Sequence, residues 1–137
     1  MRGCACRGAA GVAHVSCLAR QALVAAERTF IRWHTCGLCE QQYHGVVRCA
    51  LGWACWKTYV GRPETDWHRT AAISEVGNGL LETGLYEDAL SVKETELATL
   101  LRIGTSAHNI LDVQGNLAVT YAKLEPVSYT HLRAHET

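Results

Sequence analysis

VGNGLLETGLYEDAL, residues 76–90, decides the fold, because it joins two apolar helical patterns through Gly84. The apolar positions before that glycine are Ala72, Val76, Leu80 and Leu81, and those after it are Ala89, Val92, Leu97, Leu100 and Leu101. Recurrence at helical spacing is typical of an amphipathic helix, and a glycine between two such runs is typical of a turn. The segment is therefore predicted to form a helix–turn–helix hairpin, with its second helix over residues 86–101.

Helices are also predicted on both sides of this hairpin. Residues 46–60 are rich in Ala, Leu, Trp and Val, lack the alternation of a strand, and are followed by Gly61 and Pro63, a common helix end. The first helix of the hairpin is then expected to begin near Pro63 or Glu64. Ser106 has the side chain of an N-cap for a further helix. Together these patterns predict a mainly α fold.

The stretch around Gly84 resembles a tetratricopeptide repeat. The resemblance implies that Gly77 and Ala89 are the small residues at which two helices approach each other. It also implies that Gly84 and Tyr86 form the turn signature, and that Leu80 belongs to the same repeat signature. The hairpin is therefore expected to be one helical repeat unit.

A second copy of the first-helix pattern follows in NLAVTYAKL, residues 116–124, 41 residues further along the chain. In this copy the positions of Val76, Gly77 and Leu80 are taken by Leu117, Ala118 and Tyr121. The spacing exceeds the roughly 34 residues of the ordinary repeat and is similar to the longer repeats of kinesin light chains. The segment is also similar to repeat proteins of microalgae. Lys93 and Glu96 depart from the family, because it has apolar or small residues at these positions.

The resemblance assigns residues 63–125 to one full unit and the first helix of the next, within a helical-hairpin solenoid. Roughly three or more stacked units are normally needed for a stable array, so this chain is expected to be a fragment of a longer one. Stacked helix pairs form a groove, and the resemblance implies that protein partners bind in it. The alternative is a generic helical hairpin.

Cysteine and histidine pairs precede the helical segment, and the chain has seven cysteines in all. The pairs are Cys4 with Cys6, His14 with Cys17, and Cys36 with Cys39. Closely spaced pairs let one short turn present two donors to a zinc ion, and an odd cysteine count favours a reducing compartment such as the cytoplasm. The sequence thus predicts bound zinc. The alternative is that these are buried core thiols and a core histidine, as expected for Cys49 and Cys55.

The runs GCACRGAAGVAHVSCLA and TFIRWHTCGLCEQQYHG resemble the latter part of a RING-CH-type zinc finger. In such a finger the ligand pairs alternate between two ions. The resemblance therefore implies that one zinc ion is bound by four cysteines, Cys4, Cys6, Cys36 and Cys39. It also implies that His14 and Cys17 bind a second ion. The CxxC that would complete the second set is absent, so residues 1–45 are expected to be a finger truncated at its start. Trp33 matches the aromatic that faces a ubiquitin-conjugating enzyme in this family, and its alternative role is that of a hydrophobic anchor.

The end of the chain, PVSYTHLRAHET, can be back-translated into a sequence that resembles a transposase adapter used in preparing sequencing libraries. Residues 126–137 are therefore expected to be a non-native tail. Their two histidines, His131 and His135, are for this reason not counted as metal ligands. The predicted organisation is a zinc module over residues 1–45, a connecting helix over 46–62, and then the repeat segment and the tail.

Composition narrows the possible functions. The 13 basic and 13 acidic residues are scattered, which predicts no nucleic-acid partner. The longest apolar stretch is broken by Arg48 and Lys57 and is shorter than the roughly 20 residues of a bilayer span, so no membrane association is expected. Two hypotheses remain. The chain is either the substrate-recruiting part of a RING-type ubiquitin ligase, acting through a bound conjugating enzyme, or a non-enzymatic tetratricopeptide scaffold with a purely structural zinc element.

Overall fold

The structure is a computed structural model that describes residues 14–105 and 107–136, with side chains described as far as residue 124. In this part of the chain, five α-helices and one short 3-10 helix follow one another, and the only β pairing is an isolated bridge between Thr35 and Gln42. The elements are α1 (Val15–Ala25), η2 (Ile31–Trp33), α2 (Gly45–Tyr59), α3 (Trp67–Glu82), α4 (Tyr86–Ile103) and α5 (Ala107–Glu136). The predicted mainly α fold is confirmed.

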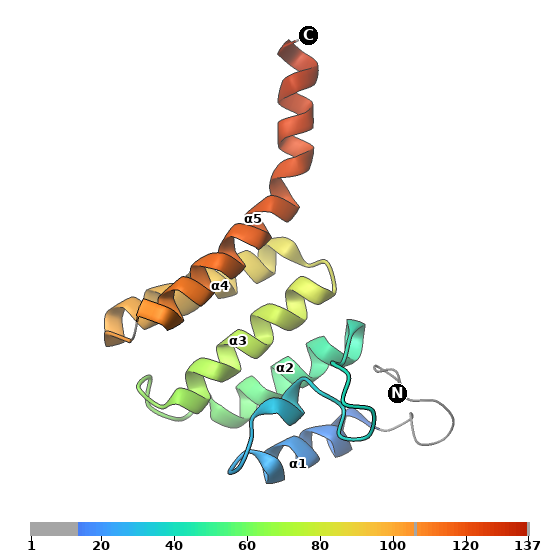
Figure 1. Cartoon of the computed structure of the whole chain (residues 1–137), viewed down its shortest axis with the longest axis vertical. Helices are drawn as coiled ribbons and strands as arrows, with labels where there is room; N and C mark the ends of the chain where they lie inside the picture. The colour runs from blue at the N-terminus through green and yellow to red at the C-terminus, as the bar shows by residue number, and fades with distance from the viewer. Residues whose placement is uncertain (1–13, 106, 137) are drawn as a thin grey trace.

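The helices from α2 to α5 are stacked in chain order, each packing on the next (Figure 1). Helix α1 and η2 pack on α2 at one end of this stack, and α5 lies at the other end. The last turns of α5 extend away from the stack. No helix in the described residues is both long and apolar enough to cross a bilayer.

The hairpin predicted around Gly84 is confirmed. Gly84 has a φ of 81°, in the left-handed region that glycine adopts without strain. Its N–H donates to the carbonyl of Leu81, and the N–H of Leu85 donates to the carbonyl of Leu80 (3.0 Å), so the carbonyls at the end of α3 are satisfied by the turn. Ser106, the expected N-cap of the last helix, lies outside the described residues.

Helix α3 begins later than the sequence predicted. The expected start near Pro63 or Glu64 is wrong, because residues 63–66 form a turn in which the Asp66 N–H donates to the Pro63 carbonyl (2.9 Å). The carboxylate of Asp66 then accepts from the His68 N–H (2.8 Å). An aspartate N-cap satisfies an otherwise unpaired backbone donor, so α3 begins at Trp67.

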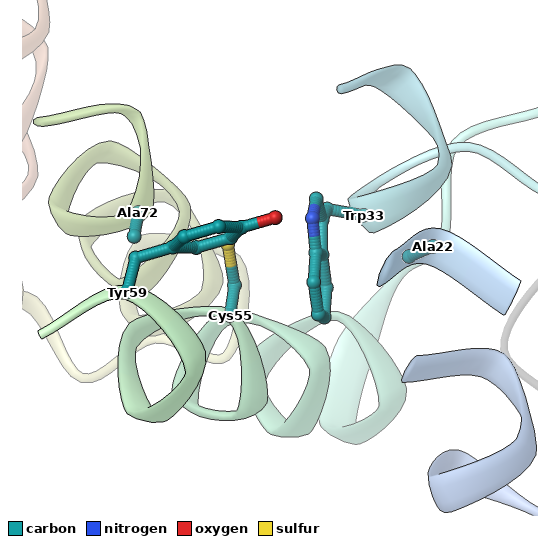
Figure 2. Close-up of a cluster of buried hydrophobic side chains, with 5 residues drawn as sticks. All are labelled: Ala22, Trp33, Cys55, Tyr59 and Ala72. Carbon is teal, nitrogen blue, oxygen red and sulfur yellow. The ribbon is translucent and has the colours of Figure 1, made fainter. Parts of the chain in front are cut away.

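Aromatic rings join the N-terminal elements to α2 and α3. Trp33 packs edge-on against Tyr59, with ring centroids 6.2 Å apart, and Phe30 lies 5.8 Å from the same tyrosine ring. Figure 2 shows the Tyr59 hydroxyl pointing toward Trp33, with Cys55 and Ala72 beside the rings. Such edge-to-face pairs add stability beyond their buried area.

The expected core role of Cys55 is confirmed. Its side chain is fully buried within the aromatic cluster of Trp33 and Tyr59. Burial raises the pKa of the Cys55 thiol, because the charged thiolate would be poorly solvated there. Cys49 is half-buried and packs on the apolar residues shared by α3 and α4.

Two glycines let α2 and α3 approach very closely. A Cβ placed on Gly52 would lie 2.6 Å from the carbonyl oxygen of Glu75, and one on Gly79 would lie 2.8 Å from the Cα of Cys49. Both neighbours are backbone atoms, which cannot move aside as a flexible side chain can. The packing of α2 on α3 therefore requires glycine at both positions.

Helix α5 continues through Pro126 to Glu136. The boundary predicted at residue 126 is thus not marked by a change of secondary structure. The non-native origin of residues 126–137 stays a prediction from the sequence.

Candidate functional site

Cys36 and Cys39 lie on a short hairpin between η2 and α2. The Cys36 N–H donates to the Gln41 carbonyl (2.9 Å), and the Tyr43 N–H donates to the His34 carbonyl (2.8 Å). These bonds hold the two arms together, so both cysteines sit on one tight turn.

A backbone N–H of this turn points at one of the two sulfur atoms. The Leu38 N–H donates to the Sγ of Cys36 at 3.4 Å, and Glu40 closes the turn with a left-handed φ of 58°. Arg32 holds the turn from outside, donating to the carbonyl of Cys36 and forming a two-point contact with the Glu40 carboxylate (3.0 and 3.2 Å). Hydrogen bonds to a sulfur favour its charged form, which is the form that binds zinc.

The predicted zinc ligands are only partly within the described residues. Cys36 is 5% exposed and Cys39 is half-buried, both against an apolar cluster that includes Tyr43. His14, the residue before α1, and Cys17, in its first turn, are exposed. Within the described residues, no three His, Cys, Asp or Glu side chains come together in a way that could hold a metal ion.

Cys4 and Cys6, the other half of the predicted four-cysteine set, lie outside the described residues. The structure therefore describes only half of the predicted set, Cys36 and Cys39, on one turn.

Trp33, predicted as a candidate partner-facing residue, is 1% exposed. Its indole packs against Tyr59 and Phe30, and Ala22 of α1 lies in the same cluster. This is the position of a hydrophobic anchor, the alternative role that the sequence allowed.

Charged side chains are buried between α2, α3 and α4. Lys93 is 0% exposed, Glu96 is 4% exposed, and their Nζ and Oε2 atoms are 3.9 Å apart. The Lys93 ammonium donates to the Asn78 side-chain oxygen (2.6 Å), while the Glu75 carboxylate lies 2.7 Å from His34 Nδ1. The contact between His34 and Glu75 connects the cysteine hairpin to α3.

Burial dominates the titration of the Lys93 and Glu96 pair. It lowers the pKa of Lys93, although the nearby carboxylate of Glu96 acts in the opposite direction. It raises the pKa of Glu96, although Lys93 and the Ser74 hydroxyl oppose that change. Oε2 of Glu96 accepts no hydrogen bond from the described residues. This buried carboxylate therefore has one oxygen without a hydrogen-bond donor among the described residues, although buried oxygens normally have one.

The sequence contained a signal for this buried pair that was interpreted only as a departure from the repeat family. Ala89, Lys93, Glu96 and Leu100 are spaced by four, three and four residues, so they share one face of α4. All four are buried. A lysine and a glutamate in the apolar stripe of a helix therefore indicated an internal ion pair.

The predicted repeat-signature residues of the first unit lie between α3 and α4. A Cβ on Gly77 would lie 2.8 Å from the Cε of Lys93, so the Lys93 side chain of α4 packs directly against Gly77. Leu80 and Ala89 are buried in one cluster, and Tyr86 begins α4.

The residues predicted to repeat the first-helix pattern lie in α5, and they differ from one another in burial. Leu117 is buried against α4, but Ala118 and Tyr121 are exposed, and the Tyr121 hydroxyl donates to Glu94 (2.8 Å). Gly77 and Leu80 are covered by the helix that follows them, whereas no described helix follows α5.

A groove lies between α3, α4 and α5. It encloses about 360 Å³ and is lined by side chains of all three helices, among them Trp67, Thr70, Ser74, Glu96, Asp112 and Asn116. This volume is near the lower end of the roughly 300–1,000 Å³ of typical ligand pockets. The groove combines apolar walls with several hydrogen-bonding groups.

Comparison with known proteins found no match to this chain among protein-family models, curated proteins or solved structures.

Proposed function

We propose that this chain is a protein-binding module of the tetratricopeptide type, which holds a segment of a partner protein in the groove between α3, α4 and α5. The observation that carries the proposal is the groove itself, because three consecutive helices contribute side chains to it. Stacked helix pairs present such concave surfaces, and the polar lining supplies donors and acceptors for a peptide.

The position of Trp33 supports the scaffold hypothesis over the ubiquitin-ligase hypothesis. An aromatic residue that faces a conjugating enzyme has to be accessible, and Trp33 is buried. We therefore propose a non-enzymatic scaffold, with the cysteine hairpin as its structural element.

We propose further that zinc is held by Cys36 and Cys39 together with Cys4 and Cys6. The tight hairpin and the N–H directed at Cys36 fit a thiolate pair. Zinc would supply a covalent cross-link between the start of the chain and the hairpin, which contacts α3 through His34. Thiolate ligands require reduced cysteines, so the module is proposed to act in a reducing compartment such as the cytoplasm.

Zinc content measured on the purified, reduced and metal-replete protein tests this site. One zinc per chain is expected, and it should be lost in both Cys36→Ser and Cys39→Ser, because each variant removes one of four thiolates. Cys49→Ser is the matched control and should keep the metal, since Cys49 lies on α2 outside the hairpin. Absence of zinc from the unmodified protein, or its retention in Cys36→Ser, would contradict the proposal.

Peptide binding to the groove is tested by filling it. Asn116→Trp places a large ring in the groove and is expected to abolish binding to an immobilised array of random short peptides. Gln114→Trp is the matched control, because Gln114 is exposed on the same helix and does not line the groove. If the unmodified protein bound no peptide of the array, or if both variants behaved alike, the proposed function would be wrong.

A further inference from the structure

Helix α5 has a long apolar face that no described part of the chain covers. The helix packs on α4 through Val113 and Leu117, and it is the last layer of the stack (Figure 1). Of the described elements, only α4 packs extensively on it. The side turned away from α4 is exposed and carries apolar or small residues at helical spacing. We call it the α5 outer face, and its residues are Leu111, Gly115, Ala118, Val119 and Ala122.

The corresponding side of α3 is covered by a helix. With the offset of 41 residues between the two patterns, Ala118 corresponds to Gly77 and Leu117 corresponds to Val76. Leu117 and Val76 are both buried. Gly77, however, packs against the Lys93 side chain of α4, whereas Ala118 is exposed. Helix α5 is therefore open on the side where α3 receives a further helix.

Two opposite charges lie along one edge of the α5 outer face. Asp112 and Lys123 are exposed, and no other Asp, Glu, Lys or Arg is found among the described side chains of α5. They are 11 residues apart, close to three helical turns, so they lie on one line along the helix, with Val119 between them. Asp112 also lies 3.5 Å from His108 of its own helix, but exposed pairs of this kind contribute little. The edge is therefore acidic at one end and basic at the other.

A second copy of the same helix matches this arrangement when it runs in the opposite direction. In an antiparallel pair related by a twofold axis, the same edges of the two helices meet. Asp112 of each copy then lies level with Lys123 of the other, so two pairs of opposite charge flank the contact. Gly115 and Ala118 fall near the crossing point, where small side chains let the helix axes approach each other. A parallel pair would instead place like charges side by side.

We infer that this chain forms a homodimer in which the α5 outer face packs antiparallel against the same face of a second copy. The exposed side chains of Leu111 and Val119 supply the apolar surface that becomes buried. The contact covers about 20 Å of helix, which is a small interface, so the dissociation constant is expected to be on the order of 10–100 µM. None of the outer-face residues lines the groove, so the dimer does not depend on peptide binding.

Sedimentation velocity of the full chain tests this inference, from low micromolar to nearly millimolar concentration. Reducing conditions exclude dimers linked by disulfides. The protein is expected to shift from one chain to two with rising concentration, and to form nothing larger, because a twofold pairing is closed.

Variants assign the dimer to α5, with circular dichroism as the check of folding. Ala118→Arg changes an exposed position at the crossing point, so it should fold normally and stay monomeric. Asp112→Lys makes both charge pairs repulsive and should weaken the dimer by about tenfold. Adding Lys123→Asp to that variant restores opposite charges and should recover the original affinity. Glu27→Lys is the matched control, because it changes the net charge equally on an exposed residue at the other end of the stack.

Recovery of the dimer by the double variant supports the inference, because a second charge reversal would not restore a contact made elsewhere. A chain that stays monomeric at every concentration would overturn the inference. So would a dimer that Ala118→Arg leaves intact, or one that the exchange of charges does not restore. Species that grow beyond two chains would indicate head-to-tail stacking and would also overturn it. The peptide array tests the proposed function separately, so either proposal can fail without the other.

Discussion

Replacing Lys93 alone with methionine is expected to lower the free energy of unfolding by about 3–5 kcal/mol, the usual cost of leaving a buried charge without its partner. Lys93 is 0% exposed, and its removal leaves the Glu96 carboxylate buried without its counter-ion. Methionine keeps an unbranched stem against Gly77, so the change in shape is small. Because small domains are stable by only about 5–15 kcal/mol, urea denaturation will register the loss clearly.

The double variant Lys93→Met with Glu96→Leu tests whether the destabilisation by Lys93→Met comes from the unpaired charge or from the change in side-chain shape. Replacing both members of a buried ion pair by apolar residues is often neutral, or stabilising by about 1–4 kcal/mol. The double variant is therefore expected to be at least as stable as the unmodified protein. Lys57→Met serves as the control, because Lys57 is exposed on α2 and its loss should change stability little. A double variant as unstable as Lys93→Met would show that shape, and not charge, sets the cost.

Gly52→Ala is expected to destabilise the protein by about 3 kcal/mol, at the upper end of the range for overpacking a core. The added methyl group would lie 2.6 Å from the Glu75 carbonyl oxygen, so α2 and α3 would have to separate. This opposes the intrinsic preference, because alanine normally stabilises a helix over glycine by roughly 0.5–1 kcal/mol. The expected sign is therefore the reverse of what helix propensity alone predicts.

Gly115→Ala is the matched comparison on α5. Beyond its own stretch of helix backbone, no described atom lies within 4 Å of the position that its Cβ would take, so only the propensity gain of roughly 0.5–1 kcal/mol should remain. Thermal denaturation of both variants gives the contrast directly. If Gly52→Ala were as stable as the unmodified protein, the close packing of α2 on α3 described above would be contradicted.

Much of the fold could be predicted from the sequence because its signals are local. The turn at Gly84 needs only a residue that tolerates a positive φ, and the helices beside it follow from apolar spacing over a few turns. The start of α3 was missed because two N-terminal signals compete within four residues. Pro63 suits a first helical position, but the Asp66 carboxylate reaches the His68 N–H and determines the start.

The candidate site was less accessible to sequence reasoning, since its parts are distant along the chain. Glu96 and Asp112 become neighbours in one groove only when α4 and α5 pack together. The contact of His34 with Glu75 joins residues 41 positions apart, and no spacing pattern connects them. The zinc prediction for Cys36 and Cys39 came from the local spacing of the pairs, from the odd cysteine count and from the resemblance to a RING-CH-type finger. Cys4 and Cys6, the other half of the predicted set, lie outside the described residues.

The aromatic cluster around Tyr59 lies in the part of the chain that contains the tryptophans, so tryptophan fluorescence reports mainly on that part. All four tryptophans, Trp33, Trp53, Trp56 and Trp67, precede α4 in the sequence. Trp33 is enclosed by other rings, whereas Trp53 and Trp67 are exposed to water. Tryptophan emission therefore reports on the attachment of the cysteine hairpin to α2 and α3, while far-ultraviolet dichroism also reports on α4 and α5. Recording both signals during unfolding separates loosening at one end of the helical stack from loosening at the other.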